Sequence, residues 1–159
     1  MPVTHLIVGR PGSGRTRTVE QLIATEKLTS GPTVTVWGIE PTRPGRLRGP
    51  DRTADADQAV QLLTEAAAIA GRRLGNGSGR EYEPTAAEPR IQVVIDGAEP
   101  LLRDTEAAGL LQFLVVVGRT TGVETVLAVT DTGLDTWPIA LRRRFHDGAV
   151  TQLTDPRTA

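Results

Sequence analysis

The glycine-rich segment at residues 9–16 carries the strongest chemical signal in the sequence. It reads Gly9-Arg10-Pro11-Gly12-Ser13-Gly14-Arg15-Thr16 and matches the phosphate-binding pattern G-x-x-x-x-G-K-[ST], except that Arg15 stands in the place of the lysine. Glycines let successive backbone N–H groups turn toward phosphate oxygens, and the N-terminal end of the following helix adds positive potential. The pattern predicts a nucleotide site made by these residues: Arg10, Pro11, Gly12, Ser13, Gly14, Arg15, Thr16 and Arg17.

A carboxylate at the end of an apolar run is the second signal. The run Ile91–Ile95 reads as a buried strand, and Asp96 follows it directly. In P-loop proteins an Asp at this place helps to hold Mg²⁺ beside the hydroxyl of the loop. We therefore predict Thr16 and Asp96 as the metal-site residues, and ATP or ADP with Mg²⁺ as the ligands.

Composition excludes several other kinds of site. The 159 residues include no cysteine, and the two histidines, His5 and His146, have no ligand-spaced companions, so we expect no zinc site. A formal net charge of −1 and an aromatic content of 3% argue against autonomous DNA binding, although DNA contact stays possible. No apolar run approaches the length of a membrane span, and no leader segment is visible, so we predict a cytoplasmic protein.

Apolar runs alternate with helical patterns along the chain. Loops are expected at 41–50 and 75–89, and Thr53 is interpreted as a helix N-cap. Alternating strands and helices predict an α/β, three-layer fold with a mostly parallel five-stranded sheet. We expect a single domain at 1–154 with a short tail at 155–159. The expected strands are 5–8, 33–39, 91–95, 123–129 and 149–153, and the expected helices are 16–27, 53–74, 105–121 and 137–143.

Taken in order, these segments resemble the FtsK/SpoIIIE-type DNA-translocase ATPases, including their conjugative-plasmid and type VII secretion relatives. The resemblance spans about residues 5 to 153 and implies a RecA-like P-loop NTPase fold that works in rings of subunits. It rests on the P-loop and on four further segments: Gly38-Ile39-Glu40-Pro41, the helix end at 66–73, the Walker B-like stretch 93–102, and the Arg-containing turn at 118–123.

The chain departs from that family's pattern at several catalytic positions. Arg15 replaces the P-loop lysine, and Gly97 stands where the resemblance implies a catalytic glutamate. Three residues are weak candidates for catalytic roles: Glu99 for the missing carboxylate, Arg119 for an arginine finger toward a neighbouring subunit, and Thr130 for the sensor residue. Losing both the lysine and the glutamate predicts weak or absent hydrolysis, as in a pseudo-ATPase.

Several functions remain open at this point. The favoured one is an ATP-binding regulatory or structural subunit, alone or in a homo- or hetero-oligomeric ring. A second is an active DNA-dependent ATPase completed in trans by partner subunits. A third is a protein-interaction module that no longer binds nucleotide. A small-molecule kinase is least favoured, because the segment 41–50 makes an unconvincing lid.

Overall fold

The computed structural model describes residues 4–77, 79–133 and 137–154. The described chain contains six strands and five α-helices, with one 3₁₀ turn (η1, Gly31–Thr33). The strands are β1 (Thr4–Val8), β2 (Val34–Ile39), β3 (Arg52–Ala54), β4 (Arg90–Asp96), β5 (Val123–Val129) and β6 (Ala149–Gln152). The helices are α1 (Arg15–Ser30), α2 (Ala56–Asn76), α3 (Glu99–Arg103), α4 (Thr105–Thr121) and α5 (Ile139–His146).

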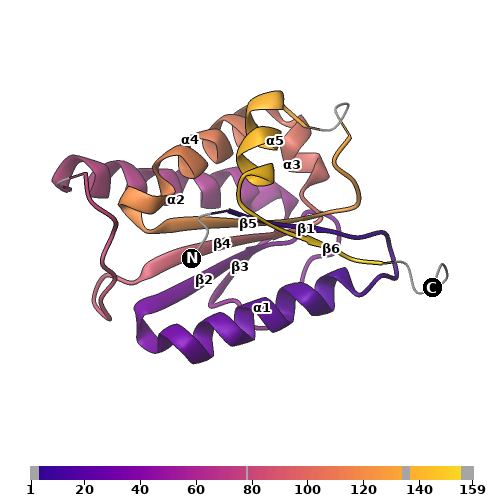
Figure 1. Ribbon diagram of the computed structural model, residues 1–159, viewed down its shortest axis with the longest axis horizontal. Coiled ribbons are helices and arrows are strands. Elements are labelled where there is room, and N and C mark those ends of the chain that lie inside the picture. Colours follow the sequence, from indigo (N-terminus) through magenta and orange to yellow (C-terminus); the bar gives the residue numbers. More distant parts are fainter. Residues whose placement is uncertain (1–3, 78, 134–136, 155–159) are drawn as a thin grey trace.

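All six strands form one parallel sheet in the order β3-β2-β4-β5-β1-β6. Helix α1 covers one face of the sheet, and α2, α3, α4 and α5 lie on the other face (Figure 1). This arrangement confirms the predicted three-layer α/β fold. The predicted tail at 155–159 lies outside the described residues.

The strands are apolar on both sides because helices cover both faces of the sheet. Side chains alternate along each strand, so neighbouring residues enter different clusters. Leu6 and Val93 belong to the larger cluster with α2 and α4, whereas Ile7 and Val94 pack with Val19 of α1. The continuous apolar runs in the sequence therefore correspond to central strands.

Two details of the sequence-based prediction were wrong. The sheet has six strands rather than five, because β3 pairs in parallel with the end of β2. Thr53 lies in β3, and the N-cap of α2 is Asp55, whose carboxylate accepts a hydrogen bond from the Gln58 backbone N–H at 3.1 Å. Because β3 is only three residues long and its first two are exposed, it leaves no apolar run in the sequence.

Helix α4 tolerates the β-branched run at Val115–Val117 because tertiary packing outweighs local preference. Val115 and Val117 are buried, and Asp104 caps the helix by accepting a hydrogen bond from the Ala107 N–H at 2.8 Å. Within the described residues, none of the helices combines the length and the apolar character that crossing a membrane requires.

Candidate functional site

The segment after β1 folds into a tight loop that only glycine allows at two positions. Gly12 and Gly14 have φ angles of 83° and 85°, in the left-handed region. The Ser13 N–H donates to the Arg10 carbonyl at 3.0 Å and closes a turn between them. Gly9 leaves room for two neighbouring side chains, since a Cβ there would lie 2.4 Å from Ser13 Oγ and 2.9 Å from Leu153 Cδ1. The predicted phosphate loop therefore has the curvature that its sequence pattern demands.

Helix α1 begins directly after this loop. Gly14 is its N-cap and offers no capping side chain, so the N–H groups of the first turn have no partner within the helix. Arg15, Thr16 and Arg17 make up that first turn. An exposed helix start with free N–H groups and a positive dipole end is suited to bind an anion.

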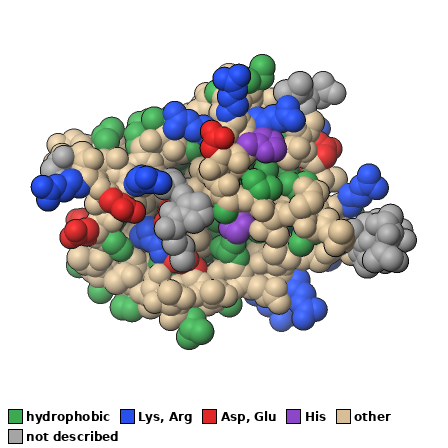
Figure 2. Space-filling model, viewed as in Figure 1, with side chains coloured by type: hydrophobic (Ala, Val, Ile, Leu, Met, Phe, Trp, Pro, Cys, Tyr) green, Lys and Arg blue, Asp and Glu red, His purple; other side chains and the backbone are tan. Residues whose placement is uncertain are grey.

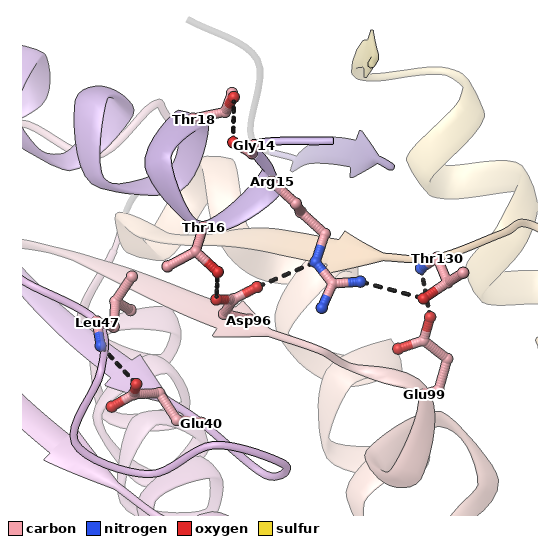
Figure 3. Close-up of polar contacts among 9 residues, drawn as sticks. All are labelled: Gly14, Arg15, Thr16, Thr18, Glu40, Leu47, Asp96, Glu99 and Thr130. Atoms are coloured by element: carbon pink, nitrogen blue, oxygen red, sulfur yellow. Dashed lines mark hydrogen bonds and ion pairs between the residues drawn. The ribbon is translucent and has the colours of Figure 1, made fainter. Parts of the chain in front are cut away.

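Arg15, Thr16, Asp96 and Thr130 form one hydrogen-bonded cluster at the ends of the strands (Figure 3). The Thr16 hydroxyl donates to Asp96 Oδ2 at 2.7 Å. Arg15 Nε donates to Asp96 Oδ1 at 3.2 Å, and Arg15 Nη1 donates to Thr130 Oγ1 at 3.2 Å. Both side chains of the ion pair are largely buried, with exposed fractions of 20% for Arg15 and 11% for Asp96.

Sheet topology explains why these residues meet. β5 lies between β1 and β4, and all three strands are parallel, so their carboxyl ends reach the same edge of the sheet. The phosphate loop follows β1, Asp96 ends β4, and Thr130 follows β5. Arg15 thus spans the end of β5 to reach the end of β4. Sites of α/β proteins lie at this edge of the sheet.

The residues after Asp96 turn sharply into the short helix α3. Gly97 has a φ of 81°, and a Cβ on it would lie 3.0 Å from Thr42 Oγ1 and 3.6 Å from Arg15 Nη2. Glu99 is the first residue of α3, and its carboxylate accepts a hydrogen bond from the Thr130 backbone N–H. The structure therefore brings Glu99 and Thr130 into the site, whereas position 97 contributes no side chain.

The segment 41–50 forms the opposite wall of the site and is held by a buried acid, Glu40. Glu40 is 3% exposed, and its carboxylate accepts backbone hydrogen bonds from Gly45, Arg46 and Leu47 at 3.1, 2.8 and 2.5 Å. Sequence reasoning noted Glu40 only as part of a family-like segment. Its neighbours Arg43 and Arg46 were missed as site residues, because nothing in the local pattern shows which way a loop folds.

Together these walls enclose a cavity of about 570 Å³. Its lining includes five arginines and three carboxylate residues, so positive side chains outnumber negative ones. Glu40 is one of those acids, and its charge is already satisfied by backbone N–H groups. The residues that line the cavity are Arg10, Pro11, Gly12, Gly14, Arg15, Thr16, Arg17, Glu40, Thr42, Arg43, Arg46, Asp96, Gly97, Glu99 and Thr130.

The residues present could take part in holding Mg²⁺. A hydroxyl and a carboxylate, on Thr16 and Asp96, lie 2.7 Å apart and offer the oxygen ligands that this ion prefers. Within the described part of the chain no three His, Cys, Asp or Glu side chains gather to bind an ion by themselves. A magnesium ion here would therefore need phosphate oxygens and water to complete its shell, as is usual for nucleotide sites.

Of the three catalytic candidates, Arg119 is the one that does not line this cavity. It is exposed in the last turn of α4, near the start of β5 and thus at the other edge of the sheet. A larger cavity of about 700 Å³ also lies near that edge, between the end of α2 and residues 80–89. Arg73 there stacks on Tyr82, and its Nη1 and Nη2 donate to the carbonyls of Thr121 and Pro89, so both terminal nitrogens make structural bonds.

Solved structures of known ATPases share this fold. The cytoplasmic domain of the type VII secretion ATPase EccC from Thermomonospora curvata matches with a TM-score of 0.78 at 18% identity, covering 96% of this chain. EssC (ATPases 2 and 3) from Geobacillus thermodenitrificans matches with a TM-score of 0.68 at 13% identity over 89%. The pCW3 conjugation coupling protein TcpA, solved with ATPγS, matches with a TM-score of 0.66 at 18% identity over 91%.

These matches concern one part of much longer proteins. The chain spans 20% of the EccC chain, 30% of the EssC chain and 47% of the TcpA chain. No protein-family model matches the sequence, and a search of curated proteins finds no match. The resemblance that the motifs indicated is thus confirmed at the level of fold: the chain has the RecA-like fold of the FtsK/SpoIIIE-type P-loop ATPase domains found in type VII secretion and conjugation.

Proposed function

We propose that this protein binds ATP or ADP in the cavity above the phosphate loop, hydrolyses it slowly or not at all, and serves as a regulatory or structural subunit. The observation that carries the proposal is the uncapped start of α1, which faces a cavity rich in arginine at the carboxyl edge of the sheet. A polyphosphate there would meet backbone N–H groups, the helix dipole and several guanidinium groups.

Where a magnesium ion accompanies the nucleotide, Thr16 and Asp96 are the side chains that would hold it. When bound, the ion would neutralise charge on the outer phosphates. The hydroxyl of Thr16 is oriented by its bond to Asp96, so the two oxygens are positioned before any ligand arrives. Arg15 contributes a fixed positive charge beside them.

Slow hydrolysis follows from how the carboxylates of the site are placed. Gly97 provides no group that could activate water. Glu99 lines the cavity, but its carboxylate already accepts the Thr130 N–H. Loss of a general base typically lowers a rate by about 10²- to 10⁴-fold, and replacement of the lysine by Arg15, whose guanidinium is paired with Asp96, adds to this loss.

A second candidate function is an ATPase that is completed in trans. Arg119 is exposed and far from the cavity of its own chain, a placement that leaves it free to reach a neighbouring subunit. DNA is a weaker expectation, because basic side chains on the face seen in Figure 2 are scattered among acidic and apolar ones rather than gathered in a band. DNA-stimulated phosphate release would identify this alternative.

The first test is a calorimetric titration of the whole chain with ATP and with ADP in the presence of Mg²⁺. We expect micromolar binding to wild type and at least about tenfold weaker binding to Thr16→Val, which keeps the shape of residue 16 but removes the hydroxyl that satisfies Asp96 Oδ2 beside the phosphates. Thr16→Ser is the matched control and is expected to bind like wild type. Phosphate release with and without DNA is then measured on the same samples.

Failure of folded wild-type protein to bind either nucleotide would contradict the proposal and favour the nucleotide-free interaction module. Binding with rapid phosphate release by the isolated chain would contradict the slow-hydrolysis part alone. Release that appears only when DNA or another ATPase subunit is added would support the alternative in which partners complete the site.

A further inference from the structure

The ion pair between Arg15 and Asp96 occupies the carboxylate on which a magnesium site at this loop would depend. Both oxygens of Asp96 are engaged, Oδ1 by Arg15 Nε and Oδ2 by the Thr16 hydroxyl. The pair is largely buried, so solvent screens it weakly. A divalent ion that approached Asp96 would have to share this carboxylate with the guanidinium.

Arginine can do here what lysine cannot. A guanidinium carries five N–H donors in a planar fork, whereas an ammonium is a single point of charge. Arg15 uses Nε for Asp96 and Nη1 for Thr130, and Nη2 makes none of the hydrogen bonds found among the described residues. Arg15 lines the cavity, so Nη2 can donate to a phosphate oxygen while Nε stays on Asp96.

We propose that Arg15 links Asp96 to the bound phosphates and thereby replaces the divalent ion, so that this protein binds nucleoside polyphosphates with little dependence on Mg²⁺. The inference rests on the proposed nucleotide-binding function and deepens it. It concerns binding only and requires no chemical step.

The charges around the cavity support metal-independent binding. A magnesium ion normally offsets two negative charges of the polyphosphate. Arg10, Arg17, Arg43 and Arg46 line the same cavity as Arg15, from both the phosphate loop and the segment 41–50. The carboxylates of Glu40 and Glu99 are held by backbone N–H groups. Guanidinium groups therefore supply the compensating charge from two walls.

The shape of the site also supports metal-independent binding. A Cβ on residue 97 would stand 3.6 Å from Arg15 Nη2 and 3.0 Å from Thr42 Oγ1, so a longer side chain there would compete with the guanidinium for space. With glycine at this position, the guanidinium of Arg15 lies between Asp96 and Thr130 (Figure 3). Arg15 in place of the lysine and Gly97 in place of the glutamate are therefore sterically compatible.

The test compares ATP titrations of the whole chain in excess Mg²⁺ and in excess EDTA, for wild type and for Arg15→Lys. For wild type we expect dissociation constants within about threefold of each other, a difference under about 0.7 kcal/mol. For Arg15→Lys we expect EDTA to weaken binding by at least about tenfold relative to Mg²⁺, because lysine has a single nitrogen and does not hold Asp96 and a phosphate on separate nitrogens, as the guanidinium does.

The outcomes separate this inference from the function on which it rests. Wild-type binding in Mg²⁺ that EDTA weakens by tenfold or more would overturn metal-independent binding and leave the nucleotide site standing. Absence of binding under both conditions would instead overturn the proposed function itself. Equal metal dependence of wild type and Arg15→Lys would show that Arg15 does not replace the ion, whatever the absolute affinity.

Discussion

At the scale of single residues, the backbone conformation of Gly97 and its neighbours Thr42 and Arg15 limit which side chains position 97 can carry. The φ of Gly97 is 81°, a conformation that costs a residue with a Cβ about 1–2 kcal/mol. A Cβ at position 97 would also crowd Thr42, at 3.0 Å from its Oγ1, and would touch the guanidinium of Arg15 at 3.6 Å. A glutamate at this position would therefore need a different backbone turn after β4, and replacing Gly97 alone does not rebuild a catalytic base.

We predict that Gly97→Ala lowers the free energy of unfolding by about 1 kcal/mol or more, because it forces a left-handed residue and a tight contact. Gly71→Ala is the control: Gly71 lies inside α2 with open space around its Cα, and alanine there should stabilise by about 0.5–1 kcal/mol. Urea unfolding measures both. A Gly97→Ala protein as stable as Gly71→Ala would contradict the strain described for residue 97.

The sequence predicts part of this site and misses part of it, for physical reasons. The approach of Thr16 to Asp96 could be predicted, because a phosphate loop and a strand-ending carboxylate meet at one edge of a parallel sheet. The partners of Arg15 could not, since a long flexible side chain reaches many neighbours. The position of Glu99 depends on α3, a helix of five residues that is too short to produce a periodic pattern.

At the scale of elements, the segment 41–50 is a loop without regular structure whose shape depends on one buried carboxylate. Three consecutive N–H groups, from Gly45 to Leu47, donate to Glu40 at the end of β2. Leu47 is buried beneath the segment and packs with the α1-side core. These contacts present Arg43 and Arg46 to the cavity, so the loop acts as a fixed wall of the nucleotide site.

Glu40→Gln should therefore weaken both the loop and nucleotide binding. The amide keeps the shape of the carboxylate but loses its charge-assisted bonds, and we expect a destabilisation of about 1–3 kcal/mol with weaker ATP affinity. Glu20→Gln is the matched control, since Glu20 accepts a single N–H, from Arg48, at the exposed side of the same segment. Hydrogen exchange at the Leu47 N–H and calorimetry provide the measurements; equal effects of the two variants would disprove the role of Glu40.

Sequence patterns were most reliable for elements with long periodic or apolar runs. The expected strands at 5–8, 33–39, 91–95 and 123–129 all appear, because central parallel strands are apolar on both faces. The edge strand β3 carries exposed Arg52 and Thr53, so its pairing with β2 depends on tertiary contact rather than on local pattern. Helix boundaries shifted by a few residues, as at α5, where caps are weak.

At the scale of the whole molecule, a buried ion-pair group ties three elements together at the edge of the sheet opposite the nucleotide cavity. Arg90 begins β4; its Nη1 lies 2.5 Å from Glu124 Oε2 on β5, and its Nη2 donates to Glu26 on α1. The exposed fractions of these side chains are 14%, 12% and 6%. Burial raises the pKa of Glu124, and Arg90 opposes that rise without cancelling it.

Arg90→Met should therefore destabilise the fold in a pH-dependent way. Removing the cation leaves Glu26 and Glu124 buried without their ion-pair partner, with only the Ser30 hydroxyl still donating to Glu26, and breaking a buried pair typically costs about 3–5 kcal/mol near neutral pH. A carboxyl with a higher pKa in the folded protein than in the unfolded chain destabilises the fold at pH values above both, where it is charged. This destabilisation disappears once the carboxyl is protonated. The loss should thus shrink as pH falls from 7 toward the ordinary glutamate value of 4.5.

Unfolding of Arg90→Met measured by denaturant at several pH values checks this sign. Lys27→Met is the control: it breaks the exposed pair between Lys27 and Asp51, which should contribute under about 1 kcal/mol because water screens it. An Arg90→Met loss that is constant between pH 5 and pH 7, or no larger than that of Lys27→Met, would contradict the role given to the buried pairs of Arg90. A loss that falls with acid would establish this group as the tie between α1 and the sheet at the edge remote from the nucleotide.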